Sequence, residues 1–255
     1  MTPIITFTSD FGHSDPYVAA VKGVMKSVAP TAEIIDITHE VPPGDVLAGG
    51  LALASAAFFF PVGTVHLAVV DPGVGTDRCI AAADLDGRFF VAPDNGLLCR
   101  AASRASERRF VYVENPRYWR PDPCPTFHGR DIMGPVAAHL AAGAALDLLG
   151  PPATALVPDA WEPPACLPGG LLQGKVVSID RFANCITNIS SGDLVRVKTV
   201  VTAGQSVPFV HTFADVPVGA PLAYFGSSGY LEVAVNRADA SRTLGLRIGD
   251  PVSVS

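Results

Sequence analysis

The chain has 255 residues, a length that allows one or two domains with a sizeable buried core. Apolar residues make up 49% of the chain and charged residues 16%, so the composition excludes a disordered protein. The net charge is −6 and no basic cluster occurs, which argues against nucleic acid or an anionic membrane as the main partner.

Strand and helix patterns alternate through the first part of the chain. Three β-rich runs occupy residues 3–8, 32–38 and 63–70. Residues 15–30 have the apolar spacing of a helix, with Asp15 as a plausible N-cap. Residues 44–60 are also helical, and their most apolar part is too short to span a bilayer. This alternation predicts an α/β domain with a largely parallel sheet.

The following segments extend this domain. Residues 79–85 and 88–96 have the pattern of two strands that close in a turn. Residues 130–150 predict a helix of small residues that is interrupted at Pro135.

Proline marks the predicted end of the first domain. The chain contains 23 prolines, and six of them fall between Pro151 and Pro168. Such a stretch cannot continue a helix or a central strand. We therefore predict an α/β domain over residues 1–155, a linker over 156–168, and a second domain over 169–255.

The second domain has a different pattern, with short strands separated by turns rich in Gly, Asn, Asp and Pro. The expected strands lie within residues 171–180, 185–190, 194–202, 208–213, 220–226, 230–235 and 251–255. They predict a smaller all-β domain, either a barrel or a sandwich.

Cysteine usage bears on the compartment. The five cysteines are scattered and never form a CxxC pair. We therefore expect reduced, mostly buried thiols and a cytoplasmic protein.

Three polar groupings stand out as candidate sites: residues 8–15 (TSDFGHSD), 69–78 (VVDPGVGTDR) and 126–131 (TFHGRD). Ligands of open α/β sheets collect outside the C-terminal ends of the strands, where such groupings are expected. Taken singly, each grouping is also an ordinary turn or cap sequence, and a lone histidine or arginine is more often structural.

Taken together, the groupings allow two kinds of site. A metal site would use side chains of the types that bind hard metal ions, namely Asp10, His13, Asp15, Asp71 and His128. No HxH or HExxH spacing supports such a site. A metal-free site would use Asp71, Arg78 and His128 to position and activate a water molecule.

Six motifs occur in an order that resembles one known family. They are TSDFG (8–12), VVDPGVGTDR (69–78), APDNGLL (92–98), PTFHGRDIM (125–133), IDRFANCITNI (179–189) and YFGSSGYLEVAVN (224–236). The chain is similar through its whole length to the S-adenosyl-L-methionine (SAM) hydroxide adenosyltransferases, or SAM hydrolases, which are relatives of the SAM-dependent fluorinase and chlorinase. The resemblance implies an α/β domain joined to a β-barrel. It also implies homotrimers whose active sites lie between the N-terminal domain of one subunit and the C-terminal domain of its neighbour.

The resemblance implies roles for residues of the first domain. Asp10 resembles the aspartate that holds the ribose 2′- and 3′-hydroxyls, and Phe127 falls among the substrate-binding residues. Asp71, Arg78 and His128 match the set that marks the hydroxide-using branch. Halide-using relatives instead have tyrosine, threonine and serine in place of Asp71, Val74 and Gly129, and they carry a long insertion at 84–93.

The resemblance also implies a second half of the site in the C-terminal domain. Phe182 and Asn184 resemble the pair that contacts adenine, and Asp180 and Ser227 the groups that hold the methionine amine. Ser228 stands where the fluorinase has a carboxylate-binding arginine. From the residues alone, the ordinary structural interpretations are favoured: Phe182 as barrel core, Asn184 and Asn188 as turn residues, and 227–229 as a hairpin turn.

The implied reaction is attack of water or hydroxide on the ribose C5′ of SAM, which releases adenosine and L-methionine. The leaving group departs as a neutral thioether and needs no general acid, and no metal or redox cofactor is required. Two alternatives stay open: a metal-dependent phosphoesterase and a non-catalytic protein that binds SAM or adenosine.

Overall fold

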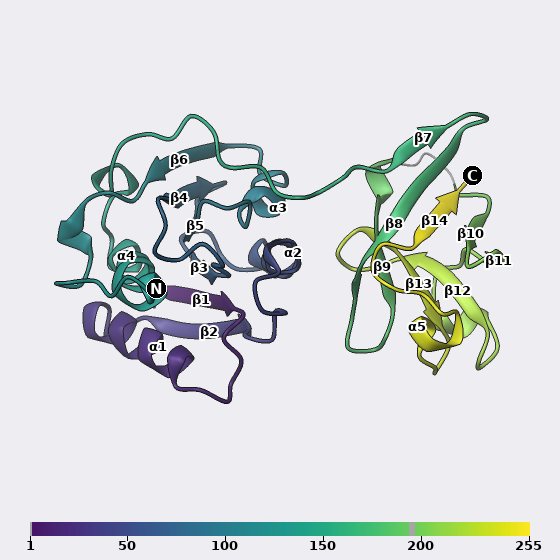
Figure 1. Ribbon diagram of the computed structural model, residues 1–255, viewed down its shortest axis with the longest axis horizontal. Coiled ribbons are helices and arrows are strands. Elements are labelled where there is room, and N and C mark those ends of the chain that lie inside the picture. The colour runs from purple at the N-terminus through teal and green to yellow at the C-terminus, as the bar shows by residue number, and fades with distance from the viewer. Residues whose placement is uncertain (1, 194–196) are drawn as a thin grey trace. The chain divides into compact units, whose positions relative to one another are not determined.

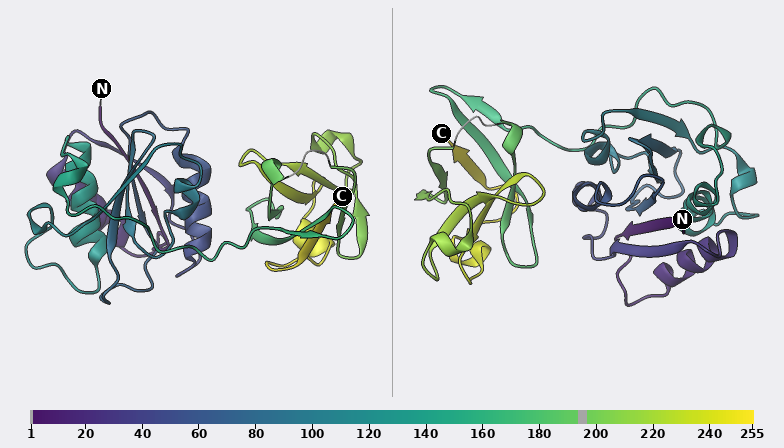
Figure 2. Two further views of the ribbon diagram at one scale, coloured as in Figure 1. Left: turned by 90° about the horizontal axis from the view of Figure 1, so that it is seen from above. Right: turned by 180° about the vertical axis from the view of Figure 1, so that it is seen from behind.

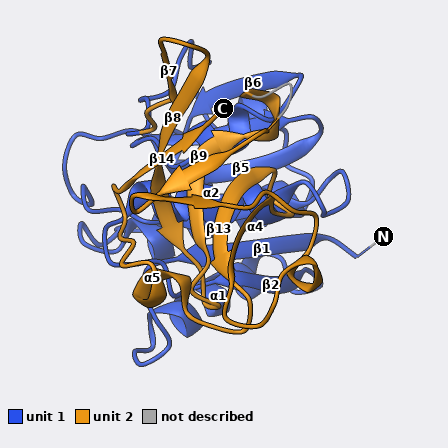
Figure 3. Cartoon of the chain, turned by 90° about the vertical axis from the view of Figure 1, so that its right-hand side faces the viewer, with its two compact units in different colours: residues 1–160 blue, residues 161–255 orange. Residues whose placement is uncertain are grey.

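The computed structural model describes residues 2–193 and 197–255, which form two compact units divided between Ala160 and Trp161 (Figures 1 and 3). This division lies inside the proline-rich segment 156–168. The end of that segment is not a bare linker, because β7 (Ala165–Leu167) pairs antiparallel with β8 (Leu171–Ile179).

The N-terminal unit is built on a six-stranded sheet in the order β2-β1-β3-β5-β4-β6. Its strands are β1 (Ile4–Ser9), β2 (Glu33–Thr38), β3 (Val65–Val69), β4 (Ile80–Leu85), β5 (Arg88–Pro93) and β6 (Arg108–Tyr112). Strands β2, β1, β3 and β5 are parallel, and β4 is antiparallel to both of its neighbours. A tight turn at Asp86 and Gly87, both with positive φ, joins β4 to β5 as the sequence predicts.

Helices cover both faces of this sheet and make three layers (Figure 2). Helices α1 (Tyr17–Val28) and α4 (Gly134–Ala141) pack on one face, and α2 (Val46–Ala57) and α3 (Cys99–Ala102) pack on the other. Alternate residues of β3 enter the two cores: Leu67 and Val69 face α1 and α4, whereas Ala68 faces α2. The predicted α/β class and its largely parallel sheet are confirmed.

Two predicted helix details are wrong. Helix α1 has Pro16 at its N-cap and no side-chain cap, so Asp15 does not cap it. Pro135 does not interrupt a helix, because a π-helical turn over Gly129–Met133 precedes α4 and Pro135 lies in the first turn of α4. The helical run continues through Pro135 from His128 to Ala141, so the proline does not end it. The chain leaves α4 at Ala141 and ends this region in a short 3-10 turn, Leu146–Leu148.

The C-terminal unit is an antiparallel sheet that curls into a nearly closed barrel, as predicted. Its strand order is β11-β10-β14-β8-β9-β13-β12, with β7 beside β8. The further strands are β9 (Cys185–Ser190), β10 (Val200–Thr202), β11 (Gln205–Val207), β12 (Pro221–Phe225), β13 (Tyr230–Val235) and β14 (Pro251–Val254). The sheet closes through a parallel bridge between Phe209 and Ala223, next to β11 and β12.

Some predicted strands of this unit differ. Residues 194–196 of the segment 194–202 lie outside the described residues, and β10 takes only its end. Residues 208–213 contribute the Phe209 bridge and a 3-10 turn, Phe213–Asp215, instead of a strand. A short helix, α5 (Ala240–Thr243), packs on the barrel core.

The expectation of mostly buried thiols is wrong. All five cysteines are free, but only Cys185 is buried, whereas Cys79 and Cys166 are exposed. The exposed pair lie in a loop before β4 and in the short strand β7, where backbone runs at the surface. Among the helices described, none is long and apolar enough to cross a membrane.

Candidate active site

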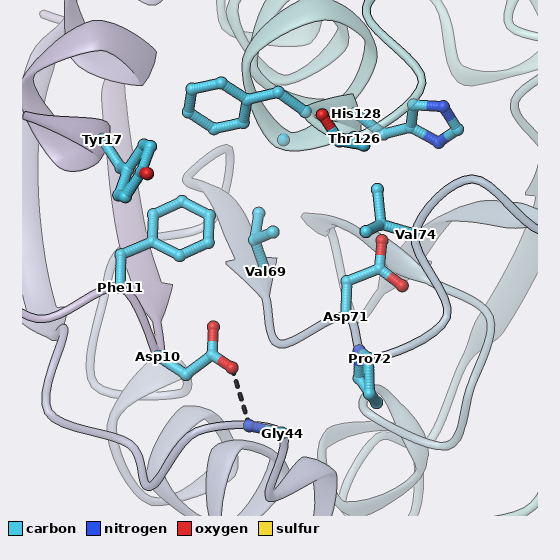
Figure 4. Close-up of a pocket in the computed structure, with 12 residues that line it drawn as sticks. Asp10, Phe11, Tyr17, Gly44, Val69, Asp71, Pro72, Val74, Thr126 and His128 are labelled. Atoms are coloured by element: carbon cyan, nitrogen blue, oxygen red, sulfur yellow. Dashed lines mark hydrogen bonds between the residues drawn. The ribbon is translucent and has the colours of Figure 1, made fainter.

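A cavity of about 430 Å³ opens in the N-terminal unit at the C-terminal ends of β1 and β3 (Figure 4). Asp10 follows β1 directly, and Asp71 lies two residues after β3. Parallel strands bring these positions to one edge of the sheet, where ligands of such folds bind. The lining residues are Asp10, Phe11, Tyr17, Gly44, Val69, Asp71, Pro72, Val74, Thr126, Phe127, His128 and Gly129.

Asp71, Arg78 and His128 converge at one wall of this cavity. Arg78 Nε donates to Asp71 Oδ1 at 2.8 Å, and Arg78 Nη2 donates to Asp71 Oδ2 in the second bond of a bidentate pair. The same Nη2 lies 2.9 Å from His128 Nδ1. The two charged side chains are only 6% and 10% exposed, so solvent screens their attraction weakly.

The loop between β3 and β4 folds back so that Arg78 can reach Asp71. Gly75 has φ +81°, a conformation that favours glycine, and a Cβ there would lie 2.9 Å from the carbonyl oxygen of Pro125. Thr76 Oγ1 donates to Gly73 O at 2.7 Å and closes the bend. The glycine-rich stretch is therefore needed both for the turn and for its close approach to the segment that carries His128.

His128 is held as a neutral ring. Burial lowers its pKa, and the guanidinium of Arg78 lowers it further, against the opposite effect of Asp71. Because Arg78 donates to Nδ1, the ring proton belongs on Nε2. In Figure 4, one ring nitrogen of His128 is turned toward Asp71 and the other away from the cavity.

A buried carboxylate fixes the segment that carries His128. Asp131 is 2% exposed and pairs with Arg130 and Arg120. It also accepts the backbone N–H of Cys124 at 2.9 Å. These contacts explain why His128 can stand at the start of a π-helical turn, a feature common at functional sites.

Asp10 and three aromatic rings form the rest of the cavity wall. Asp10 Oδ2 accepts the Gly44 amide at 2.8 Å, and its other oxygen points into the cavity (Figure 4). Phe11, Tyr17 and Phe127 contact one another edge to face, with ring centroids 5.5–6.1 Å apart. Phe11 and Tyr17 lie across the cavity from Asp71 (Figure 4).

The C-terminal unit has its own cavity of about 530 Å³, lined by Phe182, Asn184, Phe213, Val235, Arg237 and Ala238. Phe182 is 80% exposed, so it does not belong to the barrel core. Asn184 is buried, and its side-chain amide donates to Asp180 Oδ2 at 3.0 Å.

The other predicted residues of this unit, Asp180, Ser227 and Ser228, lie outside the lining of its cavity. Asp180 Oδ1 accepts the amides of Phe182 and Asn184 and so shapes the turn that presents both. Ser227 and Ser228 lie in the turn between β12 and β13, and Ser227 is exposed.

The structure thus groups the predicted residues by unit. Asp10, Asp71, Phe127 and His128 line the first cavity, with Arg78 held behind Asp71. Apart from Phe127, Val74 and Gly129, which the resemblance singled out, sequence reasoning missed the apolar and glycine residues of the lining, because only polar groups mark chemistry in a single sequence. Phe11 was the exception that could have been found, since it adjoins Asp10 at the strand end.

The candidate metal ligands do not form a cluster. His13 packs against His39 with ring centroids 5.1 Å apart, and the nearest partner of Asp15 is Ser14. Within residues 2–193 and 197–255, no three His, Cys, Asp or Glu side chains are arranged to hold a metal ion.

This fold and site define an α/β enzyme with an acid–guanidinium–imidazole cluster at the strand ends and a barrel as its second unit. Two family domains match the chain: the SAM hydroxide adenosyltransferase N-terminal domain over residues 5–150 and the corresponding C-terminal domain over 174–253. The chain therefore belongs to the SAM hydroxide adenosyltransferase family.

Individual relatives agree with this assignment. An (R)-S-adenosyl-L-methionine hydrolase from Thermus thermophilus is 45% identical, with 99% of each chain covered. A fluorinase from Actinoplanes sp. is 32% identical, covering 99% of this chain and 97% of the relative. A crystal structure of an uncharacterized conserved protein from Thermotoga maritima superposes with a TM-score of 0.90 at 36% identity, covering 98% of this chain and 99% of that chain.

Proposed function

We propose that this enzyme hydrolyses SAM by attack of water on the ribose C5′, giving adenosine and L-methionine. The observation that carries the proposal is the bidentate Asp71–Arg78 pair with His128 against it, at one wall of a nucleoside-sized cavity. We further propose that the substrate is the R epimer at sulfur, as in the name of the relative from Thermus thermophilus.

Asp71 is the group placed to accept the proton of the attacking water. His128 has Nδ1 engaged by Arg78 and its proton on Nε2, so its ring has no free lone pair to serve as a base. Each carboxylate oxygen of Asp71 accepts one bond from Arg78 and keeps a second lone pair for water. The role of His128 is then to hold Arg78, which in turn orients Asp71.

The cavity is laid out for an in-line displacement. The water would stand at Asp71, the ribose hydroxyls at Asp10, and the sulfur would leave toward Phe11 and Tyr17 on the opposite side (Figure 4). Holding the reacting atoms in line supplies a large part of the rate. The sulfonium loses its charge as water loses a proton, so no net charge builds up in the cavity.

Water is favoured over halide by the residues around Asp71. A carboxylate beside the nucleophile repels an anion but accepts a hydrogen bond from water. At Gly129, a Cβ would lie 3.1 Å from Val69 Cγ1 and 3.5 Å from Phe11 Cζ. A serine at that position, as in the halide-using relatives, needs Val69 to shift by a few tenths of an ångström, whereas its contact with Phe11 is an ordinary one.

The second half of the substrate is assigned to the C-terminal unit. Phe182 and Asn184 would contact the adenine, and Asp180, Ser227 and Ser228 would hold the methionine. We propose a homotrimer in which a neighbouring subunit supplies these residues. Light scattering in solution tests this proposal by measuring the molar mass of the assembly. We also propose a cytoplasmic location, in keeping with five free thiols.

Incubation of the protein with each SAM epimer and a chelator tests the function. Chromatography should find adenosine and methionine in equal amounts from the R epimer. Loss of activity with chelator would favour the metal-dependent phosphoesterase instead. Recovery of intact bound SAM without product would favour a binding protein, and formation of 5′-methylthioadenosine would contradict attack at C5′.

A further inference from the structure

A buried contact between a hydroxyl and an imidazole involves the residue that precedes Asp10. Ser9 Oγ is 2.7 Å from His39 Nδ1, and the two residues are 0% and 1% exposed. The amide of Gly12 donates to the carbonyl oxygen of His39 at 2.8 Å. His39 therefore holds the residue before Asp10 and the residue two positions after it.

His39 is itself fixed from the other side. Its Nε2 lies 3.0 Å from Asp36 Oδ1, close but not aligned as a hydrogen bond, and Asp36 Oδ2 accepts from Lys22 Nζ at 2.6 Å. Phe7 and His13 pack edge to face against its ring. Burial lowers the pKa of His39, so the neutral ring accepts the serine hydroxyl proton at Nδ1.

The segment that starts at His39 also reaches the Asp10 carboxylate. It ends at Gly44, whose amide donates to Asp10 Oδ2. Residues 39–44 thus contact 9–12 at the backbone flanks and at the carboxylate itself. With one oxygen of Asp10 held by Gly44, the other oxygen points into the cavity (Figure 4).

The order Ser9, His39, Asp36 resembles the nucleophile–base–acid array of hydrolytic triads. A nucleophile must touch its substrate, however, and Ser9 has no exposed surface. The hydroxyl is turned to His39 instead, one residue away from a carboxylate that does face the cavity. Its burial favours a structural link to Asp10 over nucleophilic attack.

We propose that Ser9 and His39 are positioning residues that fix the Asp10 carboxylate toward the ribose hydroxyls of the substrate. The inference rests on the proposed function, since it takes Asp10 as the ribose contact. If the link is broken, the carboxylate remains but is free to turn. Preference for ribose over deoxyribose should then fall more than nucleoside binding as a whole.

Calorimetric titration of the full chain with adenosine and 2′-deoxyadenosine measures this preference as a ratio of dissociation constants. Wild type should prefer adenosine by on the order of tenfold, because a hydrogen bond to a charged group discriminates at that level. Ser9→Ala should reduce the ratio to about threefold or less, and Ser9→Thr, which keeps the hydroxyl, should restore it.

Thr6→Ala is the matched control. Thr6 lies on the same strand as Ser9, and its Oγ1 is 2.7 Å from His66 Nδ1 in β3. This pair is as buried as Ser9 and His39 but is not in contact with Asp10. It should lose stability and keep the wild-type ratio. His39→Gln gives a second measurement if Ser9→Ala does not fold.

The outcomes distinguish the positioning role of Ser9 and His39 from the proposed function of the enzyme. An unchanged ratio in Ser9→Ala and His39→Gln, or an equal fall in Thr6→Ala, would overturn the positioning role and leave the proposed function intact. Failure of the wild type to bind adenosine at all would overturn the proposed function, and the inference with it.

Discussion

Asp71 and Arg78 form an ion pair that is almost closed to solvent yet borders the cavity. A pair in this position costs desolvation energy and is weak evidence for a stabilising role alone. Its bidentate geometry fixes the orientation of the carboxylate, which suits a group that accepts a proton. The chemistry of the site therefore depends first on this one carboxylate.

Asp71→Asn removes the proton acceptor and should lower kcat by about 10²–10⁴-fold, the usual range for a general base. Adenosine affinity should change by only a few fold, because Asp10 and the aromatic wall remain. Steady-state kinetics and titration measure the two quantities, with folding checked by circular dichroism. Asp77→Asn, an exposed acid of the same loop, is the matched control and should keep wild-type kcat. A full rate in Asp71→Asn would remove Asp71 from the mechanism.

The state of His128 makes a prediction about pH. Its lowered pKa means that the ring is neutral at pH 7 and gains a proton only below its usual value of about 6.5. The neutral ring accepts from Arg78, so kcat should stay level from pH 8 to about 6.5 and fall only below it. An acid limb centred above pH 6.5 that vanishes in His128→Asn would contradict this assignment.

Residues close in sequence were easier to assign than residues brought together by the fold. Asp71 and Arg78 flank one glycine-rich turn after a strand, and their pairing could be predicted from that spacing. His128 is 50 residues from Arg78, and the sequence could join it to them only as one of two alternative sites, until the family resemblance favoured this set. The Ser9–His39 contact spans 30 residues and carries no motif, so the sequence alone could not reveal it.

At the scale of elements, the loop between β3 and β4 places Arg78 against Asp71 at the end of a strand. It must bend at Gly75 and return Arg78 to Asp71 while it passes within contact of Pro125. That one bend thus couples the Asp71–Arg78 pair to the segment that carries His128.

Gly75→Ala should disturb the site through the backbone. Alanine at φ +81° is disfavoured by about 1–2 kcal/mol, and its Cβ would press on the Pro125 carbonyl. We expect a lower melting temperature and a kcat reduced at least tenfold. Gly143→Ala, at a similar φ of +97° but with nothing within 4 Å, tests strain without the contact and should keep kcat. Equal kcat in both variants would show that the bend does not set the site.

Elements with strong periodic or β-rich patterns were predictable, and the elements near the site were less so. The cores of β1, β2 and β3 fall inside the predicted runs. Strands β1 and β3 are buried and largely apolar, whereas the edge strand β2 is partly exposed and was found from its β-branched residues. The π-helical turn at Gly129 has no sequence pattern of its own, and its hydrogen bonds depend on tertiary anchoring by Asp131. Pro135 was read as a break because the turn before it could not be foreseen.

At the scale of the whole molecule, the N-terminal unit encloses a histidine that stays neutral at physiological pH. His66 is fully buried beside Phe90, and burial lowers its pKa to about 3. The unfolded chain takes up this proton near pH 6.5 and the folded chain only near pH 3, so stability is lost as pH falls through that interval.

The expected loss from His66 is about 1.4 kcal/mol per pH unit below pH 6. Denaturant unfolding at pH 7, 6 and 5 measures it. His66→Gln should be less stable at pH 7, but its free energy of unfolding should fall less steeply with decreasing pH. The difference in slope should be close to that of one bound proton, about 1.4 kcal/mol per pH unit. The same slope in both proteins would mean that His66 is not the group responsible.

Attack of water on C5′ is tested most directly by isotope. Reaction of SAM in water enriched in ¹⁸O, followed by mass spectrometry, locates the oxygen that enters. We expect one ¹⁸O in adenosine, at the 5′-hydroxyl, and none in methionine. Adenosine without the label, or label in an amino-acid product such as homoserine, would contradict the role given to Asp71, Arg78 and His128.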